Sequence, residues 1–188
     1  SFTMLAISYL FYKILGLQSI KQNQHSFICY TTYYFGYYLN VLQGLKMTYN
    51  DWYEAHAKKH VAIMKKLEGL DEYDVVQYFI FENMVEKEPD FCFLYKENKK
   101  CHEMEDLNCY LCACPNFRFN DEGLSKKESQ VLYSTCSIDS KDGAQFVSED
   151  AIHQDCSGCT VPHHEDYINK HFSRDCFEIM RNVKQKKV

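Results

Sequence analysis

Cysteine is concentrated in the middle of this chain, at spacings that suit metal binding. Eight of the ten cysteines lie between residues 92 and 159. Two pairs follow the Cys-x-x-Cys pattern, Cys109 with Cys112 and Cys156 with Cys159. Two intervening residues allow a tight turn that brings both sulfur atoms onto one ion and leaves backbone amides to hydrogen-bond the thiolates. The pattern therefore predicts a metal-organised segment.

A disulfide scaffold is the alternative use of so many cysteines, and it requires an oxidising compartment. The sequence contains no Asn-x-Ser/Thr sequon, which would mark a secreted protein. In a Cys-x-x-Cys-x-Cys run, neighbouring thiols would also compete for disulfide partners. We therefore expect bound metal and reduced thiols in the cytoplasm.

The candidate ligands are numerous enough for one or two zinc ions, because a structural zinc takes four ligands, usually thiolates with an occasional imidazole. The predicted ligands are Cys101, Cys109, Cys112, Cys114, Cys136, Cys156, Cys159 and His163, with Cys92 and His102 as additional candidates.

The pairing of these ligands stays open at the level of sequence. In one arrangement the two Cys-x-x-Cys pairs share an ion, and a second ion takes Cys101, Cys114, Cys136 and either His163 or Cys92. In the other arrangement each pair belongs to a separate ion. The 43 residues between Cys112 and Cys156 exceed the usual loop of a zinc finger, so spacing alone does not decide.

The motifs resemble a known family. Asn108 opens the run Asn-Cys-x-x-Cys-x-Cys-Pro, and Asp155 opens the run Asp-Cys-Ser-x-Cys-x-x-Pro-His. With Cys101-His102 before them and Cys136 between them, they resemble the prokaryotic cysteine-rich small domain over roughly residues 90–170. That family is zinc-finger-like and occurs alone or joined to corrinoid-biosynthesis proteins. The resemblance implies metal binding and no established reaction.

Hydrophobic periodicity predicts helices on both sides of the cysteine-rich segment. We expect a helix from about residue 51 to 68 and a second over 72–86, which would form a hairpin. A final helix over about 165–183 would bury Cys176 as a small core residue. Between residues 92 and 163 the periodicity disappears, and Phe117–Phe119 with Val131–Tyr133 could form a short β-ribbon.

These elements predict a mainly α fold with an irregular, metal-organised cysteine-rich core, a small α+β fold being the alternative. The expected divisions are a helical hairpin at 47–90, a cysteine-rich metal-binding domain at 91–170, and a helix end with a basic tail at 171–188.

Residues 1–46 carry three lysines and no acidic residue, so their net charge is +3, which leaves a net charge of −8 for the remainder of the chain. We expect residues 1–46 to be an extension outside the fold, and a membrane role only if they are native.

An acidic body argues against nucleic acid as a partner, because phosphate binding requires clustered lysine and arginine. The sequence contains neither a phosphate-binding glycine loop nor a nucleophile elbow, and we assign no catalytic residue. It predicts a metal-binding module that presents a surface to a protein partner. The alternatives are an iron–sulfur or thiol redox protein and an accessory enzyme of corrinoid or cofactor metabolism.

Overall fold

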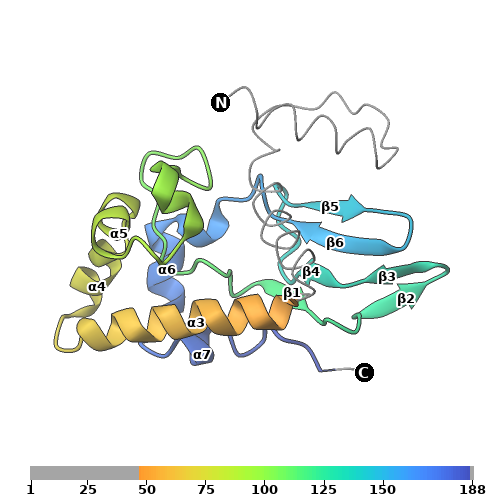
Figure 1. Ribbon diagram of the computed structural model, residues 1–188, viewed down its shortest axis with the longest axis horizontal. Helices are drawn as coiled ribbons and strands as arrows, with labels where there is room; N and C mark the ends of the chain where they lie inside the picture. Colours follow the sequence, from red (N-terminus) through yellow and green to blue (C-terminus); the bar gives the residue numbers. More distant parts are fainter. Residues whose placement is uncertain (1–46, 187–188) are drawn as a thin grey trace.

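A computed structural model describes residues 47–186 of the chain (Figure 1). The prediction about residues 1–46 concerns a segment outside the described residues. Within the described range, no helix combines the length and the apolar composition that crossing a membrane would require.

The long helix α3, Tyr49–Lys66, begins where its local sequence dictates. The Thr48 hydroxyl accepts a hydrogen bond from the Asp51 amide at 3.1 Å, and the Asp51 carboxylate accepts one from the Thr48 amide at 3.0 Å. This reciprocal capping satisfies amides that have no partner within the helix. Gly69 follows the end of α3 with a φ of +98°, a backbone conformation that glycine adopts easily. The predicted helix over 51–68 is confirmed to within two residues at each end.

The second predicted helix is wrong as a continuous element. It forms two short helices, α4 over Glu72–Tyr78 and α5 over Phe81–Lys87. At the break, Phe79 O accepts a hydrogen bond from the Cys109 amide at 2.8 Å, and the Phe81 amide donates to Leu107 O at 2.9 Å. The cysteine-rich segment thus takes the hydrogen bonds that would have continued the helix.

The C-terminal helix is also divided, into α6 over Glu165–His171 and α7 over Cys176–Ile179. The Tyr110 hydroxyl donates to Ser173 O at 2.8 Å, and the Asp175 carboxylate caps α7 by accepting from the Phe177 amide at 2.9 Å. These contacts hold an extended segment where the prediction placed helix. Cys176 is 3% exposed, which confirms its prediction as a core residue.

Among the described residues, six strands form two sheets. The two-stranded sheet pairs β1, Phe117–Phe119, with β4, Ser134–Cys136, antiparallel. The four-stranded sheet has the order β2–β3–β6–β5, with β3 and β6 parallel and the other pairs antiparallel. Its strands are β2 over Ser125–Lys127, β3 over Gln130–Leu132, β5 over Ala144–Val147 and β6 over Ala151–Asp155. Two 3₁₀ helices complete the fold, η1 over Phe93–Glu97 and η2 over Val161–His163.

The prediction of a mainly α fold is therefore wrong, because the chain is α+β. Strands of three to five residues are too short to show a clear alternation of apolar and polar side chains. The predicted β-ribbon has one strand right and its partner wrong. Phe117–Phe119 pairs with Ser134–Cys136, while Val131 and Leu132 belong to β3, between β2 and β6.

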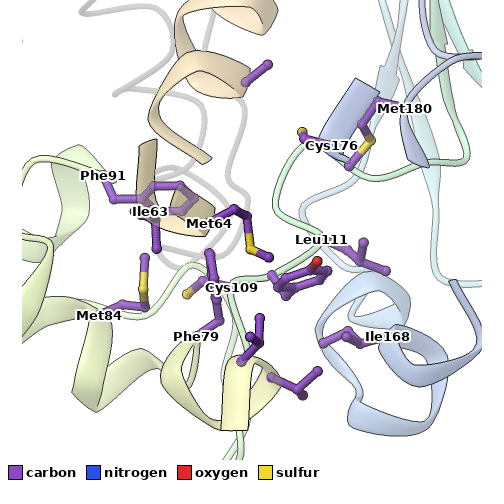
Figure 2. Packing of buried hydrophobic residues seen from close by; sticks show 14 of the residues in the cluster. Ile63, Met64, Phe79, Met84, Phe91, Cys109, Leu111, Ile168, Cys176 and Met180 are labelled. Carbon is purple, nitrogen blue, oxygen red and sulfur yellow. The ribbon is translucent and has the colours of Figure 1, made fainter. Parts of the chain in front are cut away.

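The hydrophobic core lies in the helical half (Figure 2). Its fully buried hydrophobic side chains come from α3, α4, α5 and α6, from the segment that includes Leu107, Tyr110 and Leu111, and from Phe119 in β1 and Val183. From residue 120 to residue 158 of the described chain, no hydrophobic side chain is buried. Strands β2, β3, β5 and β6 thus extend away from the core, and α3 runs along both halves (Figure 1).

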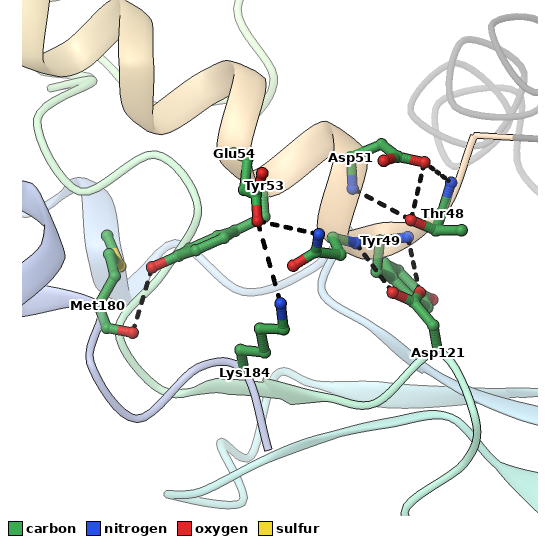
Figure 3. Close-up of polar contacts among 9 residues, drawn as sticks. Thr48, Tyr49, Asp51, Tyr53, Glu54, Asp121, Met180 and Lys184 are labelled. Carbon is green, nitrogen blue, oxygen red and sulfur yellow. Dashed lines mark hydrogen bonds and ion pairs between the residues drawn. The ribbon is translucent and has the colours of Figure 1, made fainter. Parts of the chain in front are cut away.

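The N-terminus of α3 attaches the helical half to the strands (Figure 3). The Asp121 carboxylate accepts hydrogen bonds from the amides of Tyr49 at 2.8 Å and Asn50 at 3.2 Å. A carboxylate is favourable there because the helix dipole leaves partial positive charge at this end. The Tyr49 hydroxyl also lies 2.8 Å from Nδ1 of His153 in β6.

Candidate metal centre

Cys101, His102 and His163 form a compact cluster of ligand atoms. Their sulfur and ring nitrogen atoms all lie within 4.8 Å of one another. Sγ of Cys101 is 3.7 Å from Nε2 of His163. One thiol and two imidazoles are ligands that zinc accepts, and three ligands define a site that lacks one donor of a closed tetrahedral set. The residues present therefore fit a zinc ion.

Hydrogen bonds orient both histidines for metal binding. Nδ1 of His163 lies 2.8 Å from Asn108 O, and Nδ1 of His102 lies 3.2 Å from Ser157 O. Because a carbonyl oxygen only accepts, each Nδ1 carries the proton and each Nε2 keeps its lone pair. Metal-bound histidines typically make this kind of second hydrogen bond, which fixes the tautomer and the ring orientation.

Burial keeps these imidazoles neutral. It lowers the pKa of His163 to about 4, and it lowers the pKa of His102 as well. An imidazole must be neutral to bind a metal ion. Both histidines are thus available as ligands at neutral pH.

Asn108 supports the cluster of Cys101, His102 and His163 through its hydrogen bonds. Its side-chain amide donates to Val76 O at 2.7 Å, and its side-chain oxygen accepts from the Tyr110 amide at 2.9 Å. Its backbone amide donates to His163 O at 3.3 Å. Asn108 is 3% exposed, so it links α4, the first Cys-x-x-Cys turn and η2 within the core. Its place directly before Cys109 was the only signal for this role in the sequence.

The turn after Cys109 has an unusual backbone. The Cys112 amide donates to Cys109 O at 3.2 Å, and the Cys114 amide donates to Leu111 O at 2.9 Å. Ala113 and Cys114 have φ values of 110° and 40°, in a region that residues with a side chain rarely adopt. Such a conformation persists only when surrounding contacts hold it, and it is common at functional sites.

A cavity of about 350 Å³ brings most of the predicted ligands together. Its wall contains eight of the ten candidates: Cys101, His102, Cys112, Cys114, Cys136, Cys156, Cys159 and His163. Aromatic side chains line it too, among them Trp52 and Phe117. Sequence reasoning missed this aromatic wall and the contact between Tyr49 and His153, because the contributing segments are up to 104 residues apart.

Cys109 and Cys92 lie elsewhere. Cys109 is 5% exposed in the hydrophobic core, and burial raises its pKa to about 12. Cys92 precedes η1, where the Tyr95 amide donates to Cys92 O at 3.2 Å, and burial raises the pKa of its thiol. The arrangement in which Cys109 and Cys112 share an ion with Cys156 and Cys159 therefore receives no support from this geometry.

The fold and the site define an α+β protein with a cavity lined by thiols and imidazoles. Comparisons with family models, with curated proteins and with solved structures find no match to this chain. The resemblance to the prokaryotic cysteine-rich small domain thus remains a hypothesis that rests on the motif residues.

Proposed function

We propose that this chain is a small cytoplasmic zinc-binding protein that acts as an interaction module for a protein partner. The observation that carries the proposal is the cluster of Cys101, His102 and His163, whose ligand atoms lie within 4.8 Å of one another. Both imidazoles direct Nδ1 to a carbonyl oxygen, so both have Nε2 free to bind an ion. Cys112, on the wall of the same cavity, is our candidate for the fourth ligand.

A closed zinc site of this kind stabilises the folded structure of the protein. With four protein ligands the ion has no open position for water or substrate, and its binding free energy becomes folding free energy. The acidic charge of residues 47–188 argues against nucleic acid as the partner. Reduced thiols at this density suit the cytoplasm, where thiols are kept reduced.

The number of thiols around one cavity favours one alternative, an iron–sulfur or thiol redox protein. Six cysteines line the cavity, and thiolates are the usual ligands of iron–sulfur clusters. The colour of the protein separates the two functions, because an iron–sulfur protein is brown and a zinc protein is colourless. A role as an accessory enzyme of corrinoid or cofactor metabolism rests on the family resemblance alone.

The test is metal analysis of the purified protein and of two substitutions. We expect anaerobically purified protein to contain zinc, and Cys101→Ser and His163→Gln each to lose one ion per chain. Cys176→Ala is the matched control, because Cys176 is a buried thiol outside the cavity wall. Unchanged zinc content in both Cys101→Ser and His163→Gln would contradict the proposed site.

A further inference from the structure

The strand half of the molecule lacks an apolar core of its own. Apart from Asn120 and Ser134, every residue from 120 to 158 is at least partly exposed. Short strands with one exposed face do not fold stably without a hydrophobic layer or another cross-link. Beyond β1, whose Phe119 is buried in the core, hydrophobic burial therefore contributes little to holding these strands together.

Three chain segments bring four thiols to the base of these strands. Cys114 precedes β1, and Cys136 ends β4, where it lies opposite Phe117 in the antiparallel pair. The Ser137 amide donates to Asn116 O at 2.8 Å, which ties the chain after Cys136 to the chain after Cys114. The first two thiols are thus held by the β1–β4 sheet.

The second Cys-x-x-Cys turn contributes the other two thiols. The Cys159 amide donates to Cys156 O at 3.0 Å, which closes the turn. Gly158 packs so closely that a Cβ atom there would lie 2.9 Å from Asp142 O. Cys159 Sγ lies 3.3 Å from the Ser140 hydroxyl oxygen, in the loop that follows β4. This turn therefore packs against the same loop that leads away from Cys136.

We propose that Cys114, Cys136, Cys156 and Cys159 hold a second zinc ion as a four-thiolate centre. All four line the same cavity as the first cluster. The proposal deepens the proposed metal-binding function, and it assigns the second Cys-x-x-Cys pair to a different ion from the first. The centre would join β1, β4 and the end of β6, and so supply the cross-link that the strand half lacks.

The surroundings of the sulfur atoms agree with this assignment. The Phe117 amide donates to Cys114 O at 3.0 Å, so a backbone turn holds Cys114 at the start of β1. The Ser140 hydroxyl, 3.3 Å from Cys159 Sγ, is placed to donate a hydrogen bond to a metal-bound thiolate. The four sulfurs are spread more widely than the ligand atoms of the first cluster, and a divalent cation would draw them together.

Metal counting with matched variants tests the second centre in the full chain. We expect two zinc ions per chain in the native protein and one ion in Cys156→Ser. Cys156 is the most suitable ligand to replace because it is the exposed member of the four. Cys101→Ser should also retain one ion, and the double variant should retain none. Cys176→Ala should retain both.

Cobalt separates the two centres by their spectra. Cobalt-loaded Cys101→Ser should show the stronger sulfur-to-metal charge-transfer absorption, because four thiolates would surround its remaining ion. Cys156→Ser should show a weaker band from a mixed sulfur and nitrogen site. One zinc in the native protein, still present in Cys156→Ser, would overturn the second centre and leave the first intact. The reverse result, one zinc retained in Cys101→Ser and lost in Cys156→Ser, would support the second centre and remove the first.

Alkylation of the native protein keeps the test independent of whether a variant folds. With two equivalents of zinc, mass spectrometry should find Cys114, Cys136, Cys156 and Cys159 protected from iodoacetamide. A chelator should restore the reactivity of all four. Equal alkylation of Cys156 with and without zinc would contradict the proposal. A brown protein with iron in place of zinc would also contradict it, since the proposed ion is zinc.

Discussion

At the scale of single residues, Asn108 shows how a neutral side chain can position the ligands of the proposed metal site. It binds no metal, yet it holds the carbonyl that fixes the tautomer of His163 and the turn that carries Cys112. Replacement of Asn108 leaves the Tyr110 amide without its partner in the core, and it removes one of the two hydrogen bonds that Val76 O accepts. Such groups are costly when buried.

We therefore predict that Asn108→Ala lowers the free energy of unfolding by about 2–4 kcal/mol, since two buried hydrogen bonds are lost. It should also weaken zinc binding at the first centre by roughly 10- to 100-fold, as loss of supporting hydrogen bonds typically does. Chemical denaturation and competition with a chromophoric chelator measure the two effects. Asn182→Ala is the control, because Asn182 is exposed. Zinc affinity equal to that of the native protein would show that Asn108 serves stability alone.

The two thiols of the first Cys-x-x-Cys turn should respond differently to substitution. Cys112 lines the cavity, and Cys109 belongs to the hydrophobic core. We predict that Cys112→Ser loses one zinc ion. Cys109→Ala should keep its zinc and lose about 1–2 kcal/mol of stability, as a small truncation in the core does. Zinc analysis and thermal melting distinguish them, and equal zinc loss in both variants would assign Cys109 to the metal.

At the scale of elements, the positions of Cys156 and Cys159 depend on the turn that carries them. Gly158 lies in the second Cys-x-x-Cys turn, against the backbone of Asp142. Because the obstacle is a carbonyl oxygen and not a flexible side chain, an added methyl group must displace one of the two loops. That displacement would move Cys156 and Cys159 relative to Cys136.

Gly158→Ala should consequently weaken zinc binding at the second site by roughly 10-fold or more, as the loss of a supporting contact of a metal site does. Gly69→Ala is a useful contrast, because Gly69 has a positive φ but no heavy atom within 4 Å of the added Cβ. It should reduce stability by about 1 kcal/mol through backbone strain and leave zinc binding unchanged. Zinc titration of both variants measures this, and equal affinities would show that the Asp142 loop adapts.

A second prediction at this scale concerns the contact between α3 and Asp121. Asp121→Ala removes the acceptor of two amides at the start of the helix. We expect it to reduce stability by about 1–2 kcal/mol, the range typical of a lost N-terminal cap. Asp106→Ala, at an exposed position, should have little effect. Urea denaturation followed by circular dichroism compares them, and equal midpoints would contradict the role of Asp121.

At the scale of the whole molecule, two neutral histidines are buried in the core of the helical half. His56 stacks on Trp52, and His60 packs against Phe79 and Tyr110. Burial lowers the pKa of His56 to about 3 and that of His60 to about 4. Among the described residues, neither ring nitrogen of His60 has a hydrogen-bond partner. Protonation of either ring is therefore unfavourable in the folded state.

The sign of the pH dependence follows directly. The unfolded chain takes up these protons near the ordinary histidine pKa of about 6.5, whereas the folded chain resists until the pH is much lower. The contribution to stability is thus complete above about pH 6.5 and is lost as the pH falls toward 4. One imidazole changes the unfolding free energy by up to about 1.4 kcal/mol per pH unit within this window.

We predict that His60→Leu makes stability less dependent on pH. The difference in unfolding free energy between this variant and the native protein should shift in favour of the variant as the pH falls from 6.5 to 5. Comparing the two proteins at each pH cancels the effect of proton competition at the metal ligands. Parallel pH profiles would show that His60 is protonated equally in the folded and unfolded states.

The sequence by itself determined the features that depend on near neighbours. The reciprocal cap of Thr48 and Asp51, the amphipathic period of α3 and the burial of Cys176 follow from residues within a few positions. The same holds for the ligand chemistry, because two intervening residues are enough to make a turn that presents two thiols. These parts could be predicted, and the structure reproduces the helix and the buried thiol.

The tertiary structure alone decided which segments meet. The helix predicted over 72–86 breaks because Leu107 and Cys109 take the hydrogen bonds of its backbone at Phe79 and Phe81. The β1 strand pairs with Ser134–Cys136, although Val131–Tyr133 contains more residues that favour strands. That pairing sets Cys136 opposite Phe117, three residues after Cys114, and both cysteines line the cavity, whereas Cys109 does not. Hydrogen bonds and packing between distant segments set these choices, and no local pattern in the chain encodes their partners.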